Sequence, residues 1–181
     1  ITSDQQRADC YGFAGRNIST PHLDQLAKTG SRFDSCITPN LVCQPSRASI
    51  LTGQLPFTHG VCDNGIDLNP EIAELGFAEQ LNKVGYKTSF IGKAHFATSS
   101  TFEPTGTPEC KHSSTKFGSE WYGPYMGFKH VELMTLGHWY KEKGPTLPPE
   151  GQHFERFVFE EAGGPEIFDI WHKPAKPGYG A

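Results

Sequence analysis

Apolar residues recur at helical spacing in two segments of the first half of the chain and predict helices over residues 21–30 and 72–84. A helix between them is predicted over residues 45–51, where Pro45 suits the first turn and Thr52-Gly53 is expected to end it. Thr20 can cap the first helix, Pro21 suits its first position, and Gly30 is expected to end it. The third helix carries an apolar stripe, and Gly85 is expected to close it.

Short apolar runs between and after these helices predict strands. We expect the end of a strand at residues 1–4 and further strands at residues 31–37, 86–91 and 128–134. The succession of helix, glycine and buried strand over residues 72–91 is what a parallel sheet covered by helices produces. The predicted fold class is therefore α/β, with a mostly parallel sheet flanked by helices.

The pattern weakens beyond residue 92. Residues 97–125 are rich in Ser, Thr, Pro and Gly, and a loop that long inside a domain is usually functional or disordered. Proline and glycine dominate from residue 144 onward, with one short helix predicted at 154–161 and irregular coil at 173–178. Without an internal repeat or a linker, we interpret residues 1–181 as one domain, with a regular α/β portion over about 1–96 and a loop-rich remainder.

Charge and composition narrow the function classes. The formal net charge is −4 and no Lys/Arg run occurs, which argues against nucleic acid as a partner. No apolar run approaches the roughly 20 residues of a spanning helix, so a membrane is not expected either. The chain does not begin with Met, so we interpret its amino terminus as trimmed and leave the compartment unassigned. The chain has five cysteines: Cys10, Cys36, Cys43, Cys62 and Cys110. None of them forms a Cys-x-x-Cys pair, which argues against a zinc site built from them.

The first candidate site surrounds Cys43. This cysteine precedes Pro45 at a predicted helix start, where unpaired backbone N–H groups and the helix dipole favour an anion. Arg47 follows four residues later, so its planar guanidinium can reach what the cysteine binds. These residues indicate an anion site with a sulfur nucleophile. A buried cysteine beside a surface arginine would produce the same local pattern.

The segment 43–53, CQPSRASILTG, resembles the formylglycine signature of type I sulfatases, Cys-x-Pro-Ser-Arg followed by Thr-Gly. The match comprises Cys43, Pro45, Ser46, Arg47, Thr52 and Gly53. The resemblance implies an alkaline phosphatase/sulfatase-like fold, incomplete in this chain. It also implies that a formylglycine-generating enzyme oxidises Cys43 to formylglycine. One hydroxyl of the hydrated aldehyde then attacks sulfur and the other later expels sulfate.

Two other segments agree with this resemblance. Asp4 matches the family's leading metal-binding aspartate, whereas Gln5 departs from the Asp-Asp pair of many arylsulfatases, although an amide oxygen can also bind a metal. The implied metal ligands are Asp4, Gln5 and the nucleophile at Cys43, for a divalent cation that we expect to be Ca²⁺, with Mg²⁺ or Mn²⁺ as alternatives. Asp9 is interpreted as structural.

Residues 92–95 resemble the family's Gly-Lys-x-His motif. The resemblance implies that Lys93 contacts the sulfate and that His95 assists its release. An extended backbone would direct both side chains to one face. A lone Lys-x-His pair would more often face solvent, and it is the order of the three segments that favours the catalytic interpretation.

The remaining candidates carry weaker signals. His59 matches a family turn after the signature, and we expect a structural role. Four aromatic residues could line a substrate pocket, although aromatic residues usually serve packing: Trp121, Tyr122, Trp139 and Tyr140. Five histidines have no ligand spacing and stay unassigned: His112, His130, His138, His153 and His172.

The resemblance implies a sulfuric ester hydrolase acting on a sulfate-ester small molecule or a sulfated sugar. The metal ligands, second lysine and second histidine that the sulfatase family carries later in the chain are not found here. We therefore interpret the chain as the amino-terminal part of a catalytic domain, which hydrolyses aryl sulfates poorly or not at all by itself. One alternative is a phosphonate or phosphate ester hydrolase of the same superfamily, which Gln5 favours and Lys93 and His95 oppose. Another is a chain without catalysis, which the length favours and the intact signature opposes.

Overall fold

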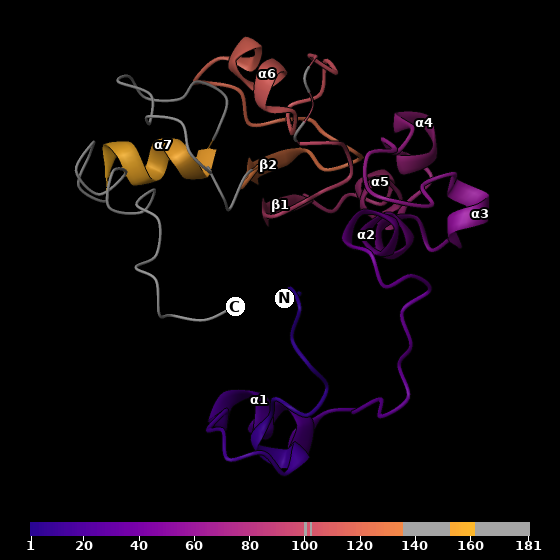
Figure 1. Cartoon of the computed structure of the whole chain (residues 1–181), viewed down its shortest axis with the longest axis vertical. Helices are drawn as coiled ribbons and strands as arrows, with labels where there is room; N and C mark the ends of the chain where they lie inside the picture. Colours follow the sequence, from indigo (N-terminus) through magenta and orange to yellow (C-terminus); the bar gives the residue numbers. More distant parts are fainter. Residues whose placement is uncertain (100, 102, 136–152, 162–181) are drawn as a thin grey trace. The chain divides into compact units, whose positions relative to one another are not determined.

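The computed structural model describes residues 1–99, 101, 103–135 and 153–161 (Figure 1). The chain divides into two compact units, residues 1–37 and residues 38–181, and each is described by itself. Within the described residues, no helix is both long enough and apolar enough to cross a membrane. Four aromatic and histidine candidates lie outside the described residues: His138, Trp139, Tyr140 and His172.

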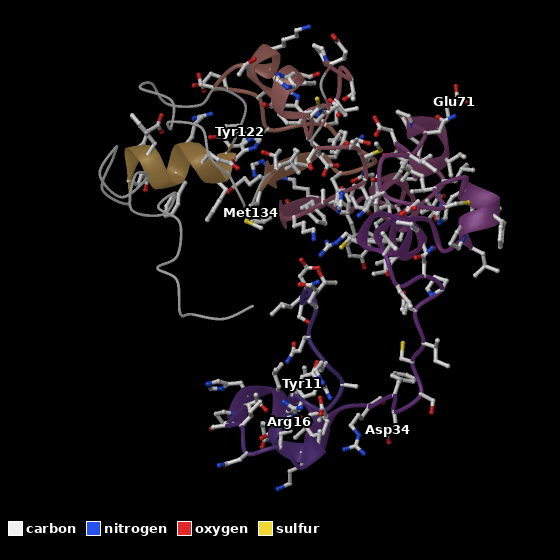
Figure 2. All side chains as sticks on the ribbon, viewed as in Figure 1. Tyr11, Arg16, Asp34, Glu71, Tyr122 and Met134 are labelled. Carbon is white, nitrogen blue, oxygen red and sulfur yellow. The ribbon has the colours of Figure 1, made fainter. Side chains whose placement is uncertain are left out.

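The first unit contains a 3₁₀ turn, η1 (Gly12–Ala14), and helix α1 (Pro21–Thr29), which confirms the first predicted helix. Thr20 does not cap this helix through a backbone N–H. Its hydroxyl instead accepts from the Gly12 N–H and donates to the Asp24 carboxylate, both over 2.8 Å, which ties the turn to the helix. The side chains of the preceding loop include Tyr11 and Arg16 (Figure 2).

Two strand predictions in this unit are wrong. Residues 1–4 lie outside any strand, and residues 31–37 form irregular chain with a turn at 34–35. No described strand lies beside residues 31–37 to pair with their backbone groups, and both Phe33 and Ile37 are at least 80% exposed. A strand without a partner cannot satisfy its N–H and C=O groups, so an apolar run alone did not produce one.

The second unit holds a parallel sheet of strands β1 (Ser89–Gly92) and β2 (His130–Leu133), which run side by side in Figure 1. Ser89 pairs with His130 and Gly92 with Leu133. Strand β2 lies inside the strand predicted at residues 128–134, and β1 overlaps the one predicted at 86–91 and ends one residue later. Their parallel pairing confirms that part of the predicted fold class. Because parallel strands need a crossover, the long segment between them carries the chain back to the same end of the sheet.

Among the described residues of this unit, seven helical elements accompany the sheet: α2 (Cys43–Thr52), α3 (Pro56–His59), α4 (Pro70–Ala73), α5 (Phe77–Lys83), α6 (Lys111–Ser114), the 3₁₀ turn η2 (Thr115–Phe117) and α7 (His153–Glu160). The helix predicted at 72–84 is broken into α4 and α5, with Gly76 between them. A Cβ atom at Gly76 would lie 2.5 Å from the Leu51 carbonyl oxygen. The break lets the backbone approach the end of α2 more closely than any other residue would allow.

The core of this unit joins α2 to both strands. Ala48 and Leu51 of α2 are buried within it. The Phe90 ring of β1 lies 5.7 Å from the Phe96 ring and 5.2 Å from the Phe128 ring, measured between centroids, in edge-on contacts. One apolar cluster therefore supports both the signature helix and the segment that follows β1.

Candidate functional site

Helix α2 begins at Cys43, earlier than the predicted start at Pro45. Val42, just before it, is extended, and Pro45 lies in the first turn, where its missing N–H costs no hydrogen bond. Cys43 and Arg47, one turn apart on the helix, are both half-buried. The sequence spacing is thus realised as one helical surface that presents a thiol and a guanidinium.

The backbone at this helix end is less available to an anion than we expected. The Gln44 N–H already donates to the Asn64 side-chain oxygen over 3.1 Å, and Pro45 has no N–H. The prediction of several unpaired N–H groups at Cys43 is therefore wrong. Positive charge for an anion must come mainly from side chains, of which Arg47 and Lys93 are the candidates in this unit.

Gln44, the variable position of the signature, is fully buried. Its side-chain oxygen accepts from the Gly65 N–H over 2.8 Å. Its amide nitrogen donates to the carbonyl of Ile66 over 2.7 Å and to that of Phe96 over 3.4 Å. Gln44 therefore connects the start of α2 to the segment after β1. Sequence reasoning missed it, because the signature leaves this position open.

A direct contact brings two of the predicted site segments together. The Arg47 guanidinium donates to the Lys93 backbone carbonyl over 2.5 Å. The helix with Cys43 and the segment with Lys93 and His95, separated by more than forty positions in the sequence, therefore meet within the second unit. In this arrangement Arg47 also positions the backbone of the Lys-x-His segment.

The Lys-x-His segment is not extended as predicted. Gly92 has φ +110°, and His95 has φ +52°, a left-handed conformation that is uncommon for a residue with a side chain. Lys93 and His95 are half-exposed, whereas Ala94 and Phe96 are buried. Burial still alternates, so both candidate side chains stay partly exposed although the chain turns at His95 and the His95 Nδ1 atom itself is buried.

A buried carboxylate lies against this turn. Glu109 is 2% exposed and accepts hydrogen bonds from the N–H groups of His95, Phe96 and Ala97 and from the Tyr125 hydroxyl. Burial raises the pKa of Glu109 to about 7, and these four donors act against that rise. Sequence reasoning missed Glu109 because it lies in a stretch without periodicity.

His59 fixes the far end of the signature helix. Its side chain is buried; Nδ1 accepts from the Val61 N–H over 3.2 Å, so Nε2 carries the proton and donates to the Ser49 hydroxyl over 2.9 Å. Burial lowers the pKa of His59 and keeps the ring neutral. These contacts fit the structural role predicted for this residue.

The predicted metal ligands Asp4 and Gln5 belong to the first unit and are exposed. Gln5 has φ +54°, so its backbone is held in a conformation that few residues adopt. Nearby Asp9 pairs with Arg7 over 2.9 Å and Arg16 over 2.8 Å, and the Arg7 hydrogen bond lowers its pKa to about 2, as suits a structural residue.

Nowhere in the described parts of the chain do three His, Cys, Asp or Glu side chains gather closely enough to hold a metal ion. The oxygens of Asp4 and Gln5 are nevertheless of the type that a hard divalent cation prefers. Because they and Cys43 lie in different units, the three-residue ligand set stays a prediction.

Four of the other aromatic and histidine candidates gather at β2: Trp121, Tyr122, His130 and His153. His153 accepts from the Leu133 N–H at Nδ1 and donates from Nε2 to the Trp121 carbonyl, which fixes a neutral ring. Tyr122, labelled in Figure 2, stacks on His130 at 5.4 Å between centroids. Tyr122 and His153 also line a pocket of about 160 Å³ between β2 and α7. His112 is exposed.

Comparison with known proteins matches this chain to sulfatases. The sequence model of the sulfatase family matches residues 1–161. An ulvan-active sulfatase of Formosa agariphila is 44% identical over 96 residues, which cover 52% of this chain and 18% of that protein. An N-acetylglucosamine-6-O-sulfatase of Bacteroides thetaiotaomicron is 40% identical over 101 residues, which cover 56% of this chain and 17% of that protein. The matched segments thus span less than a fifth of these two relatives.

A crystal structure assigned as the sulfatase yidJ of Bacteroides fragilis aligns with a TM-score of 0.50 and 30% identity. The alignment covers 55% of this chain and 23% of that one. Together with the parallel pairing of β1 and β2, this likeness confirms the predicted sulfatase-like α/β fold class.

Proposed function

The chain belongs to the sulfatase family, and on that premise we propose that it is the amino-terminal part of a sulfuric ester hydrolase whose nucleophile derives from Cys43. The observation that carries the proposal is the 2.5 Å hydrogen bond from Arg47 to the Lys93 carbonyl. This bond brings the signature helix and the Lys-x-His segment to one place, as a shared anion site requires.

The side chains of the signature helix and the Lys-x-His segment have different roles in the proposed reaction. Arg47 offers a planar set of donors for a tetrahedral oxyanion, and Lys93 adds a second positive charge for the transferring oxygens. His95 can hold or release a proton near neutral pH. When a formylglycine-generating enzyme has converted Cys43, the hydrated aldehyde supplies the oxygen that attacks sulfur.

We further propose that Asp4 and Gln5, with the nucleophile at position 43, hold a divalent cation, Ca²⁺ in the first place, with Mg²⁺ or Mn²⁺ as alternatives. Their hard oxygens suit such an ion, which would supply charge stabilisation for the sulfate oxygens. Three ligands are fewer than the six to eight that Ca²⁺ takes, so we expect further ligands from the carboxyl-terminal part of the protein.

The substrate is proposed to be a sulfate ester of a small molecule or a sugar. The Bacteroides relative is named for a sulfated sugar, N-acetylglucosamine 6-O-sulfate, which makes such sugars the first natural substrates to test. Gln5 keeps phosphonate or phosphate esters as a second candidate class, because an amide there departs from the paired aspartates of many arylsulfatases.

The test compares 4-nitrophenyl sulfate with a 4-nitrophenyl phosphonate ester, using the complete gene product co-expressed with a formylglycine-generating enzyme. We expect a higher kcat/KM for the sulfate and the loss of this activity in Cys43→Ala. A preference for the phosphonate would support the second class instead. Absence of turnover on both esters and on sulfated sugars, with formylglycine present, would refute both.

A further inference from the structure

The Glu109 carboxylate converges on three consecutive backbone N–H groups. One oxygen, Oε2, accepts from the His95 N–H over 2.5 Å. The other, Oε1, accepts from the Phe96 N–H over 2.9 Å and from the Ala97 N–H over 3.1 Å. Three N–H groups can point at one anion because the chain turns at His95, where φ is +52°. The left-handed turn at His95 therefore allows the buried Glu109 carboxylate to accept from all three N–H groups.

A fourth donor completes the environment of this carboxylate. The Tyr125 hydroxyl donates to Oε1 over 2.9 Å, so both oxygens are surrounded by donors. An ionised carboxylate, which only accepts, fits this environment, whereas a group that brings its own N–H does not. A Gln at position 109 would have to turn its NH₂ toward at least one donor, and the single donor at Oε2, the His95 N–H, would be the natural one to lose.

Residues 93–97 also accept hydrogen bonds from side chains of α2. The Lys93 carbonyl accepts from Arg47, and the Phe96 carbonyl accepts from Gln44 and, over 2.8 Å, from the Leu68 N–H. Two carbonyls of residues 93–97 thus accept from side chains of the signature helix, and three N–H groups of the same residues donate to Glu109. Between these two sets of contacts the Lys93 and His95 side chains stay half-exposed.

We propose that Glu109 is a positioning residue: its carboxylate fixes the left-handed turn at His95, so that His95 and Lys93 meet the same sulfate ester as Cys43. This inference rests on the proposed function for the role of the two side chains. It also assigns a purpose to the segment between β1 and β2, which brings Glu109 to the site from a stretch without regular structure.

The test uses the complete gene product with Glu109→Gln and the matched control Glu103→Gln, the same chemical change at an exposed position of the same segment. At a pH of about 8, Glu109→Gln is expected to lower kcat for 4-nitrophenyl sulfate about 30- to 100-fold, with KM within about threefold, because a displaced catalytic group costs rate more than binding. Glu103→Gln is expected to stay within about twofold of wild type in both constants.

Hydrogen exchange separates positioning from general destabilisation. In Glu109→Gln the amides of residues 95–97 should exchange faster, while those of α2 keep their protection. Val131→Ala serves as the control for destabilisation, because it removes buried methyl groups from β2. It should lower the melting temperature without a comparable loss of kcat. If Glu109→Gln cannot be obtained folded, Glu109→Asp takes its place, with a loss of about tenfold expected because the shorter side chain cannot reach all three amides.

An unchanged kcat in Glu109→Gln or its substitute would overturn the proposal, as would a loss matched by Val131→Ala at equal loss of melting temperature. Unchanged exchange at residues 95–97 would overturn it as well. The exchange comparison needs no turnover, so a wild-type protein inactive on every ester would refute the proposed function, while the hold of Glu109 on the turn would still be decided.

Discussion

The Arg47 guanidinium donates to the Lys93 backbone carbonyl across the junction between α2 and the end of β1. An arginine side chain has five N–H donors in a fixed planar arrangement, so it can direct donors at more than one acceptor. We therefore propose that Arg47 both positions the segment that carries Lys93 and binds the oxyanion. Lysine, with a single rotatable ammonium, cannot do both in a fixed geometry.

Replacement of Arg47 by Lys should therefore cost activity although the charge is kept. We expect kcat/KM for 4-nitrophenyl sulfate to fall about 100-fold or more in the complete gene product, since both a directed donor and the Lys93 contact are lost. Steady-state kinetics measure the effect, with the exposed Arg32→Lys as control. Activity of Arg47→Lys within about threefold of wild type would contradict the dual role.

Gln44→Ala should destabilise the protein. The change removes a fully buried side chain together with its hydrogen bonds to the Gly65 N–H and the Ile66 carbonyl, which costs about 2–3 kcal/mol in the free energy of unfolding. Urea denaturation measures the loss, and the exposed helical Gln80→Ala should change stability by no more than about 0.5 kcal/mol. Equal effects of the two changes would show that the Gln44 side chain and its hydrogen bonds contribute little to stability.

His59 predicts a loss of stability in acid. Its pKa in the folded protein is lowered by burial, so the unfolded chain binds the proton more readily as the pH falls below about 6.5. The stability present above that pH should decline as the pH falls toward the lower folded value. In His59→Gln, which stays neutral, this part of the slope should vanish, whereas the exposed His22→Gln should keep it. An identical acid slope in His59→Gln and wild type would contradict the assignment.

Glu109 should make the protein less stable as the pH rises, the opposite of the effect of His59. Its pKa is raised from 4.5 to about 7 in the folded protein, so its contribution is fully present below about pH 4.5 and is lost as the pH rises through about 7. Relative to Glu109→Gln, the wild-type protein should lose about 3 kcal/mol of unfolding free energy across this window. Denaturation of both proteins at a series of pH values measures the difference. A difference that does not change with pH would show that Glu109 has the same pKa in the folded and unfolded chain.

Much of the signature helix could be predicted from the sequence, because proline and glycine mark its ends locally. Pro45 places the first turn, and Gly53 ends the helix with φ +69°. The parallel sheet was predictable for a similar reason: a helix, a glycine and a strand follow one another along the chain. The start at Cys43 differs because Val42 becomes extended and the helix begins before the proline.

The missed features depend on contacts between distant residues. The break at Gly76 follows from the approach of the Leu51 carbonyl, which leaves no trace in the local apolar pattern of residues 72–84. Glu109 lies in a segment whose composition predicts loop, and its importance comes from three amides more than ten positions away. The strand expected at residues 31–37 had the right composition but no partner strand among the described residues.

The most direct test of the central claim is the mass of the peptide that carries residue 43, taken from the complete gene product after co-expression with a formylglycine-generating enzyme and shown to hydrolyse a sulfate ester. The proposal predicts a peptide in which the Cys43 thiol has become an aldehyde, with sulfur exchanged for oxygen and two hydrogens lost. An unmodified Cys43 throughout a fully active preparation would contradict it.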